Sequence, residues 1–144
     1  MLTLSKKVEY GLMAVLHMAT LRPSELATAK DISDAYDIPA ELLGKVMQSL
    51  ARVNLVEAVL GSRGGYKLRR PVEKITLGEV IEALEGPVHF ARCQESPDQC
   101  GQFHACNIKE PVYAIHDQLM TFIHGISLAS FRKPVKPQPV LMEL

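Results

Sequence analysis

The sequence predicts a mainly α-helical protein that carries one small β-hairpin and then a long helix. Three observations lead to this fold class. Apolar residues recur at helical spacing in several stretches before residue 53, a glycine-rich turn separates two apolar runs near residue 62, and another helical pattern occupies residues 111–126. A chain of 144 residues has room for one domain, or for one domain with an appendage.

The first predicted helix covers residues 5–21, where Val8, Leu12 and Val15 recur every three or four residues, and Pro23 interrupts the pattern. This N-terminal segment lacks the small-residue cleavage site of a signal peptide. No apolar run in the chain approaches the ~20 residues that span a bilayer. The sequence therefore predicts a cytoplasmic protein without a membrane partner.

Two short helices follow the first one. Thr28 and Asp31 form a capping-box pattern, with Asp in place of the usual Glu, and open a helix that continues through Tyr36. After the tight connection "YDIP", Pro39 suits the first position of a helix that runs to about Arg52. Two short helices with so brief a connection predict a helix-turn-helix unit.

A hairpin pattern comes directly after this unit. Residues 55–60 and 66–68 read as strands, and the turn "GSRGG" joins them. A hairpin in this place predicts a winged helix-turn-helix, which is a DNA-binding fold. Charge supports the same conclusion: residues 44–74 carry a net charge of +5 in a chain whose total is zero, whereas residues 75–106 carry −4.

The winged helix suggests which residues meet double-stranded DNA. On the helix that ends near Arg52, Leu43, Val46 and Leu50 face inward, and the opposite face would enter the major groove. Arg63 at the hairpin tip would enter the minor groove or meet a phosphate. The candidate base-reading residues are Glu41, Lys45 and Gln48, and the candidate phosphate anchors are Lys67, Arg69 and Arg70.

A further helix begins at the capping box Thr76–Glu79 and ends at Gly86. A longer helix opens at Pro111 and carries a heptad-like apolar seam. Such a helix after a winged-helix domain predicts a two-fold homodimer, which fits a palindromic operator. The residues of the seam are Val112, Ile115, Leu119, Phe122 and Ile126.

These patterns divide the chain into four parts. Residues 1–86 are the predicted winged helix-turn-helix domain, and residues 87–109 are a cysteine-containing loop. Residues 110–131 are the predicted dimerisation helix and its end. Residues 132–144, rich in proline, are expected to be a disordered tail.

All three cysteines of the chain, Cys93, Cys100 and Cys106, lie in the predicted loop with the spacing C-x6-C-x5-C. Cytosolic thiols stay reduced, so disulfides are not expected. Thiolates are soft ligands for iron–sulfur clusters, zinc and copper(I). Zinc sites usually space their cysteine pairs two to four residues apart, and the wider gaps here favour an iron–sulfur cluster. A metal-free thiol redox switch is the alternative.

Residues 2 to about 131 resemble the Rrf-two family of winged-helix regulators, and the IscR-like and NsrR-like branches in particular. The resemblance rests on "LTLSKKVEYGLMAVLHMA", "ISDAYDIPAELLGKVMQSLARVNLVEAVLGSRGGYKL", "ITLGEVIEALEG" and the cysteine triplet. It implies a homodimeric transcription factor that holds an iron–sulfur cluster, of two or four irons, at the dimer interface. It also implies cluster ligation by the three cysteines.

The resemblance leaves two candidates for a fourth ligand. The IscR-like branch uses a histidine three residues after the last cysteine, where this chain has Lys109, which has no lone pair to donate. The NsrR-like branch uses a carboxylate on the first helix of the partner subunit, and Glu9 occupies that place. His104, inside the loop, is the second candidate because imidazole ligates iron well.

The predicted function is a DNA-binding transcriptional regulator whose operator affinity depends on an iron–sulfur cluster that senses iron, redox or nitric-oxide status. A winged-helix regulator that senses a small metabolite or thiol oxidation, with metal-free or zinc-bound cysteines, is the alternative. An enzyme is not expected, because the sequence supplies no Ser/His/Asp set, phosphate loop or suitably spaced carboxylate pair.

Overall fold

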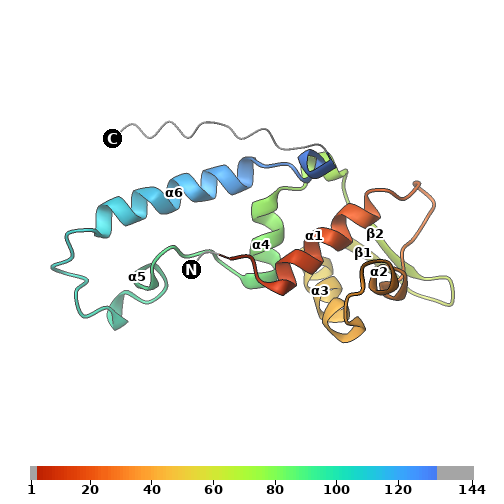
Figure 1. Ribbon diagram of the computed structural model, residues 1–144, viewed down its shortest axis with the longest axis horizontal. Helices are drawn as coiled ribbons and strands as arrows, with labels where there is room; N and C mark the ends of the chain where they lie inside the picture. Colours follow the sequence, from red (N-terminus) through yellow and green to blue (C-terminus); the bar gives the residue numbers. More distant parts are fainter. Residues whose placement is uncertain (1–2, 133–144) are drawn as a thin grey trace.

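The computed structural model describes residues 3–132 and confirms the predicted fold class. Helices α1 to α4 and a two-stranded hairpin pack together, and α6 extends away from them with the cysteine segment at its far end (Figure 1). The predicted disordered tail lies outside the described residues from 133 onward. The elements in order are α1 (Lys6–Met18), α2 (Ala29–Tyr36), α3 (Ala40–Arg52), β1 (Val56–Val59), β2 (Gly65–Leu68), η1 (Val72–Lys74), α4 (Leu77–Glu85), α5 (Arg92–Glu95), η2 (Pro97–Gln99), α6 (Lys109–Gly125) and η3 (Leu128–Arg132).

The hydrophobic core lies among α1, α3, α4 and the hairpin. Helix α1 packs against both α3 and α4, and α3 also contacts α4 and β1. Large side chains in this core, such as Leu43, Leu50 and Ile75, are fully buried. Burial of each such side chain contributes about 1.5–3 kcal/mol to folding, so this core holds the helix-turn-helix in place.

The caps of the helix-turn-helix agree with the sequence pattern in one helix and differ by one residue in the other. Thr28 and Asp31 form the predicted capping box of α2: the Thr28 hydroxyl accepts from the Asp31 N–H at 3.0 Å. Asp37 ends α2 in the left-handed conformation, with φ 53°. Pro39 is the N-cap of α3 rather than its first residue, because its backbone is still extended (ψ 122°) and the helix begins at Ala40.

The hairpin is an antiparallel pair in which Val56 faces Leu68 and Val59 faces Gly65. A short bridge ties it to the segment before α2: Ala27 and Tyr66 exchange backbone hydrogen bonds of 3.0 and 2.7 Å. The wing is therefore anchored on the helix-turn-helix as well as on its own strands.

Helix α6 returns the chain to the core at its C-terminal end. The Leu77 N–H donates to the Ile126 carbonyl, and the Leu128 N–H donates to the Ile75 carbonyl, both at 2.9 Å. Leu128 is fully buried in the same core as α1 and α3. The end of the predicted dimerisation segment thus packs into the winged-helix domain.

The N-terminal end of α6 differs from the prediction, since the helix begins at Lys109 and Pro111 is its third residue. Proline is tolerated there because the first N–H groups of a helix have no intrahelical acceptor. The preceding segment is also more regular than the predicted loop. Two single-turn helices, α5 and η2, form within it, although none of their described residues is buried.

Candidate functional site

The outer face of α3 presents the three candidate base-reading residues to solvent. Glu41 and Lys45 form an ion pair at 3.4 Å, and their side chains are 85% and 65% exposed. Gln48 is also exposed one turn further along the helix. Because the opposite face of α3 is buried in the core, these side chains point outward on a rigid helix.

The basic residues of the hairpin do not all have the same role. Arg63 lies exposed in the turn, and Arg69 is exposed just after β2. Lys67 pairs with Glu57 on the facing strand at 3.8 Å. Arg70 instead donates to Glu79 at 2.6 Å and to the Lys74 carbonyl at 3.1 Å, so it links the end of the hairpin to α4.

Glu79 is the centre of this link. It also caps α4, where its carboxylate accepts from the Thr76 N–H at 2.9 Å. Burial alone would raise the pKa of Glu79, but the hydrogen bonds from Thr76 and Arg70 outweigh it, and the pKa lies below its ordinary value. Arg70, predicted as a phosphate anchor, therefore has a structural ion pair within the chain.

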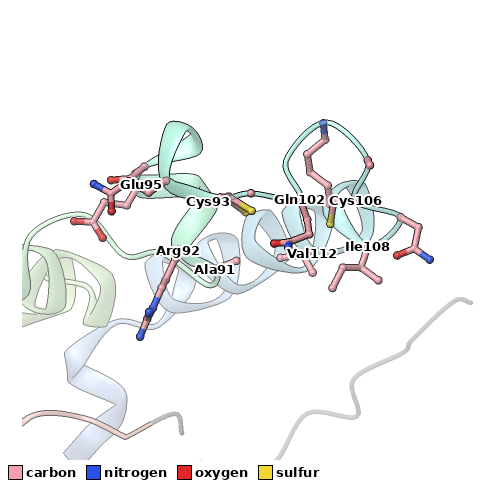
Figure 2. A pocket seen from close by; sticks show the side chains of 15 residues that line it. Ala91, Arg92, Cys93, Glu95, Gln102, Cys106, Ile108 and Val112 are labelled. Carbon is pink, nitrogen blue, oxygen red and sulfur yellow. The ribbon is translucent and has the colours of Figure 1, made fainter.

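A cavity of about 900 Å³ lies between the cysteine segment and the start of α6. Cys93, Cys100 and Cys106 all line it, and each is half-buried. Figure 2 shows Cys93 and Cys106 on opposite sides of this space, with Val112 of α6 at its wall and Arg92 pointing away from both thiols. The fold thus brings the three predicted cysteine ligands to one cavity.

The structure adds Tyr113 to this group. Burial raises the pKa of its hydroxyl above the ordinary value, and the negative charge of the Cys93 thiolate raises the pKa further, with contributions from Cys100 and Cys106. Tyr113 follows Val112, which lines the cavity. It is seven residues after Cys106, on the first turns of α6, and the aromatic residue at that place in "KEPVY" is the only sequence signal for it.

Lys109, the first residue of α6, contacts Phe103 in the last turn of the cysteine segment. Its ammonium donates to the Phe103 carbonyl at 3.3 Å and lies 4.5 Å from the centre of the Phe103 ring. Cation–π contacts of this kind contribute about 0.5–1 kcal/mol at exposed sites. Both contacts join residue 109 to residue 103, and Cys106 lies between these two residues in the chain. Lys109 therefore restrains the backbone that carries the Cys106 thiol.

Neither candidate fourth ligand lines the cavity within one chain. Glu9 lies on the first turns of α1 and pairs with Lys6 at 2.5 Å. His104 is exposed and packs edge-to-face on Phe103, with ring centres 5.5 Å apart. Of the charged side chains that could ligate a metal, Glu95 is the one that lines the cavity with the three cysteines within the described residues.

The three cysteines are suitable ligands for a thiophilic metal, but their thiols are not arranged around one metal position. Three soft sulfur donors line one cavity, which is the chemistry that iron–sulfur clusters require. In residues 3–132, however, no three Cys, His, Asp or Glu side chains lie close enough together to hold one metal ion. The thiols surround a wide space and do not converge on a single point.

Helix α6 exposes several apolar side chains of the predicted seam. Phe122 is 58% exposed and Ile115 is 47% exposed, and Ile108 just before the helix is 60% exposed. Ile123, on a different face, is buried, and α6 contacts α4. None of the helices in the part of the chain that the structure describes is long and apolar enough to cross a membrane.

Comparison with known proteins gives one family match and several similar structures. Residues 4–134 match the Rrf2 family model, described as an iron-dependent transcriptional regulator. The chain is 24% identical to Staphylococcus aureus CymR, with a TM-score of 0.67 over 92% of this chain and 100% of that one. It is 23% identical to CymR of B. subtilis, described as the global cysteine regulator, with a TM-score of 0.69 over 91% and 96%. It is 22% identical to T. potens IscR, with a TM-score of 0.68 over 94% of each chain.

Proposed function

The chain belongs to the Rrf2 family of DNA-binding transcriptional regulators, and on that premise we propose that an iron–sulfur cluster held by Cys93, Cys100 and Cys106 controls its affinity for operator DNA. The observation that carries this proposal is the single cavity that all three thiols line. Three cysteine donors suit either a two-iron or a four-iron cluster.

DNA binding is assigned to α3 and the hairpin. The exposed face of α3, with Glu41, Lys45 and Gln48, enters the major groove and contacts base edges. Arg63 at the hairpin tip contacts the minor groove or a phosphate. Lys67 and Arg69 contact phosphates, and their contribution falls as salt rises. Arg70 acts indirectly, because its bond to Glu79 fixes the end of the hairpin.

A homodimer is proposed to form through the exposed apolar seam of α6. Phe122 and Ile115 become buried when two such helices pair. Each buried CH₂ then contributes about 0.8 kcal/mol to the free energy of dimerisation. Two copies of α3 related by a two-fold axis fit a palindromic operator. Glu9 of the partner subunit is the proposed fourth ligand. Within one chain, α1 begins beside the end of α4, where Ser5 contacts Glu85.

Signal transfer from the cavity to the DNA-reading helix follows direct contacts. The cysteine segment leads into α6, α6 packs on α4, and α4 packs on both α1 and α3. A bound cluster would link the three thiols through bonds that depend on its redox state. Lys109 holds the backbone beside Cys106 through its contact with the Phe103 carbonyl. A coupling of about 1–3 kcal/mol along this route changes operator affinity about 5- to 150-fold.

A second candidate function has its own supporting observation. The three thiols do not form a ligating group in the described residues, which suits a regulator that senses thiol oxidation or a small metabolite. The cysteines would then be metal-free, or they would bind zinc only after the thiols move closer together. The similarity to CymR, described as a cysteine regulator, is compatible with this alternative.

Purification without oxygen distinguishes the two candidates. We expect the wild-type protein to contain iron and acid-labile sulfide and to absorb in the visible range. A 30-base-pair duplex, selected from a random library by this protein, should bind with different affinities before and after chelation of the iron. Protein without iron, or equal duplex affinity in both states, would contradict the cluster proposal and favour the second candidate.

A further inference from the structure

Three glycines lie inside the helices of the winged-helix domain: Gly11 in α1, Gly44 in α3 and Gly78 in α4. Glycine inside a helix is less favourable than alanine by about 1 kcal/mol. Each of these positions therefore needs a reason that outweighs its cost, and the structure supplies one for only two of the three.

Close packing explains Gly11 and Gly78. A Cβ atom on Gly11 would collide with the Leu84 side chain of α4, and it would also lie 3.5 Å from Val80. A Cβ atom on Gly78 would lie 2.7 Å from three ring atoms of His124, where α6 crosses α4. At both positions the missing side chain lets two helices approach each other.

Gly44 has no such neighbour. A Cβ atom built there would meet nothing within 4 Å among the described residues. Its φ is not positive either, since the positive-φ glycines are Gly61 and Gly86. The folded chain alone would accommodate alanine at this position and would gain stability from it.

The position of Gly44 suggests what it serves instead. It lies one helical turn after Glu41 and one turn before Gln48, and next to Lys45, so it borders the face of α3 that is proposed to read DNA. A glycine permits the backbone to approach a ligand closely. We propose that Gly44 is a contact point at which the α3 backbone packs against the sugar–phosphate wall of the major groove. This inference rests on the proposed function of α3.

Substitution separates this role from a role in folding. Gly44→Ala should raise Tm by about 3 °C, because alanine favours the helix. The same change should weaken binding to the selected 30-base-pair duplex about ten-fold, because an added group overpacks the contact. Gly44→Leu should weaken binding further while the protein stays folded, since the side chain points into open space.

Gly125→Ala is the matched control, because a Cβ atom at Gly125 near the end of α6 also meets nothing within 4 Å. It should leave duplex affinity unchanged, with sedimentation confirming an unchanged oligomeric state. Wild-type affinity in both Gly44 variants would overturn the contact at Gly44 and leave DNA binding intact. If the wild-type protein selects no duplex, both this inference and the proposed function fail.

Discussion

The winged-helix domain and the cysteine segment are held together in different ways. In the domain, side chains such as Leu50 and Ile75 are fully buried and join every helix to one core. In residues 87–109, all of which the structure describes, no side chain is buried, and order comes from local hydrogen bonds such as that from Lys109 to Phe103. A segment with few buried apolar contacts opens at low free-energy cost. The winged-helix domain is therefore rigid because of its buried core, whereas the cysteine segment has no buried side chain to hold its conformation.

The largest expected effect is loss of metal binding without loss of folding. Cys93→Ala should remove iron from the anaerobically purified protein, whereas Tm of the metal-free protein should stay within about 2 °C, because the thiol lies outside the core. Iron analysis and a thermal melt measure the two effects. Ser96→Ala, in the same cavity, is the control and should retain iron. A variant with full iron content would remove Cys93 from the ligand set.

The next effect tests the rigidity of the domain. Leu50→Ala should lower the free energy of unfolding by about 2–5 kcal/mol, because it leaves a cavity among fully buried side chains. Ile108→Ala, at a position that is 60% exposed beside the cavity, should change it by less than about 0.5 kcal/mol. Urea unfolding of metal-free protein, at matched concentrations, measures both. Equal losses in the two variants would contradict the contrast between the two regions.

A smaller effect concerns the ion pair between the hairpin and α4. The ordinary pKa of a glutamate carboxyl is 4.5, and the pKa of Glu79 in the folded protein lies below that value. A depressed folded pKa adds stability that is present above the unfolded value and is lost as pH falls through the folded value. Glu79→Gln should therefore lower the free energy of unfolding by about 1 kcal/mol at pH 7. The loss should be smaller below pH 4, where the wild-type carboxylate is itself protonated.

Urea unfolding across this pH range measures the Glu79 effect. Glu95→Gln is the matched control, since it removes a carboxylate from the exposed cysteine segment instead of from the domain. The control should leave stability unchanged at pH 7. An equal, pH-independent loss in both variants would show that the link between Arg70 and Glu79 adds nothing to the domain.

The smallest effect is local. Lys109→Met keeps the aliphatic stem but removes the ammonium that contacts the Phe103 carbonyl and ring. Amide hydrogen exchange in residues 103–108 of the metal-free protein should become several-fold faster, with no change in Tm. Lys109→Arg should restore slow exchange because a guanidinium can make both contacts. Unchanged exchange in the methionine variant would show that this contact does not restrain the segment.

Local patterns in the sequence predicted most of the domain. The capping boxes at Thr28 and Thr76 marked the starts of α2 and α4, and apolar periodicity located the inward faces of α1 and α3. These signals work because they act over four or five neighbouring residues. The single-turn helices α5 and η2 were missed, since a helix of three or four residues is too short to show a period.

The candidate site was predictable only in part. The cysteine triplet was evident from its clustering, but its arrangement around one cavity was not. The contact of Lys109 with Phe103 depends on the conformation of the turn before α6, which short-range sequence patterns do not specify. The ion pair of Arg70 also escaped prediction, because a run of basic residues does not reveal which of them has a partner on another element.

By itself, the sequence determined the helices, the hairpin, the basic and acidic segments and the presence of three soft donors, because each depends on residue type and short-range spacing. Only the tertiary structure decided which surfaces remain exposed and which side chains meet. Those outcomes depend on packing between residues far apart in the chain, as where Leu128 enters the core beside Ile75 and brings the end of α6 back to the domain.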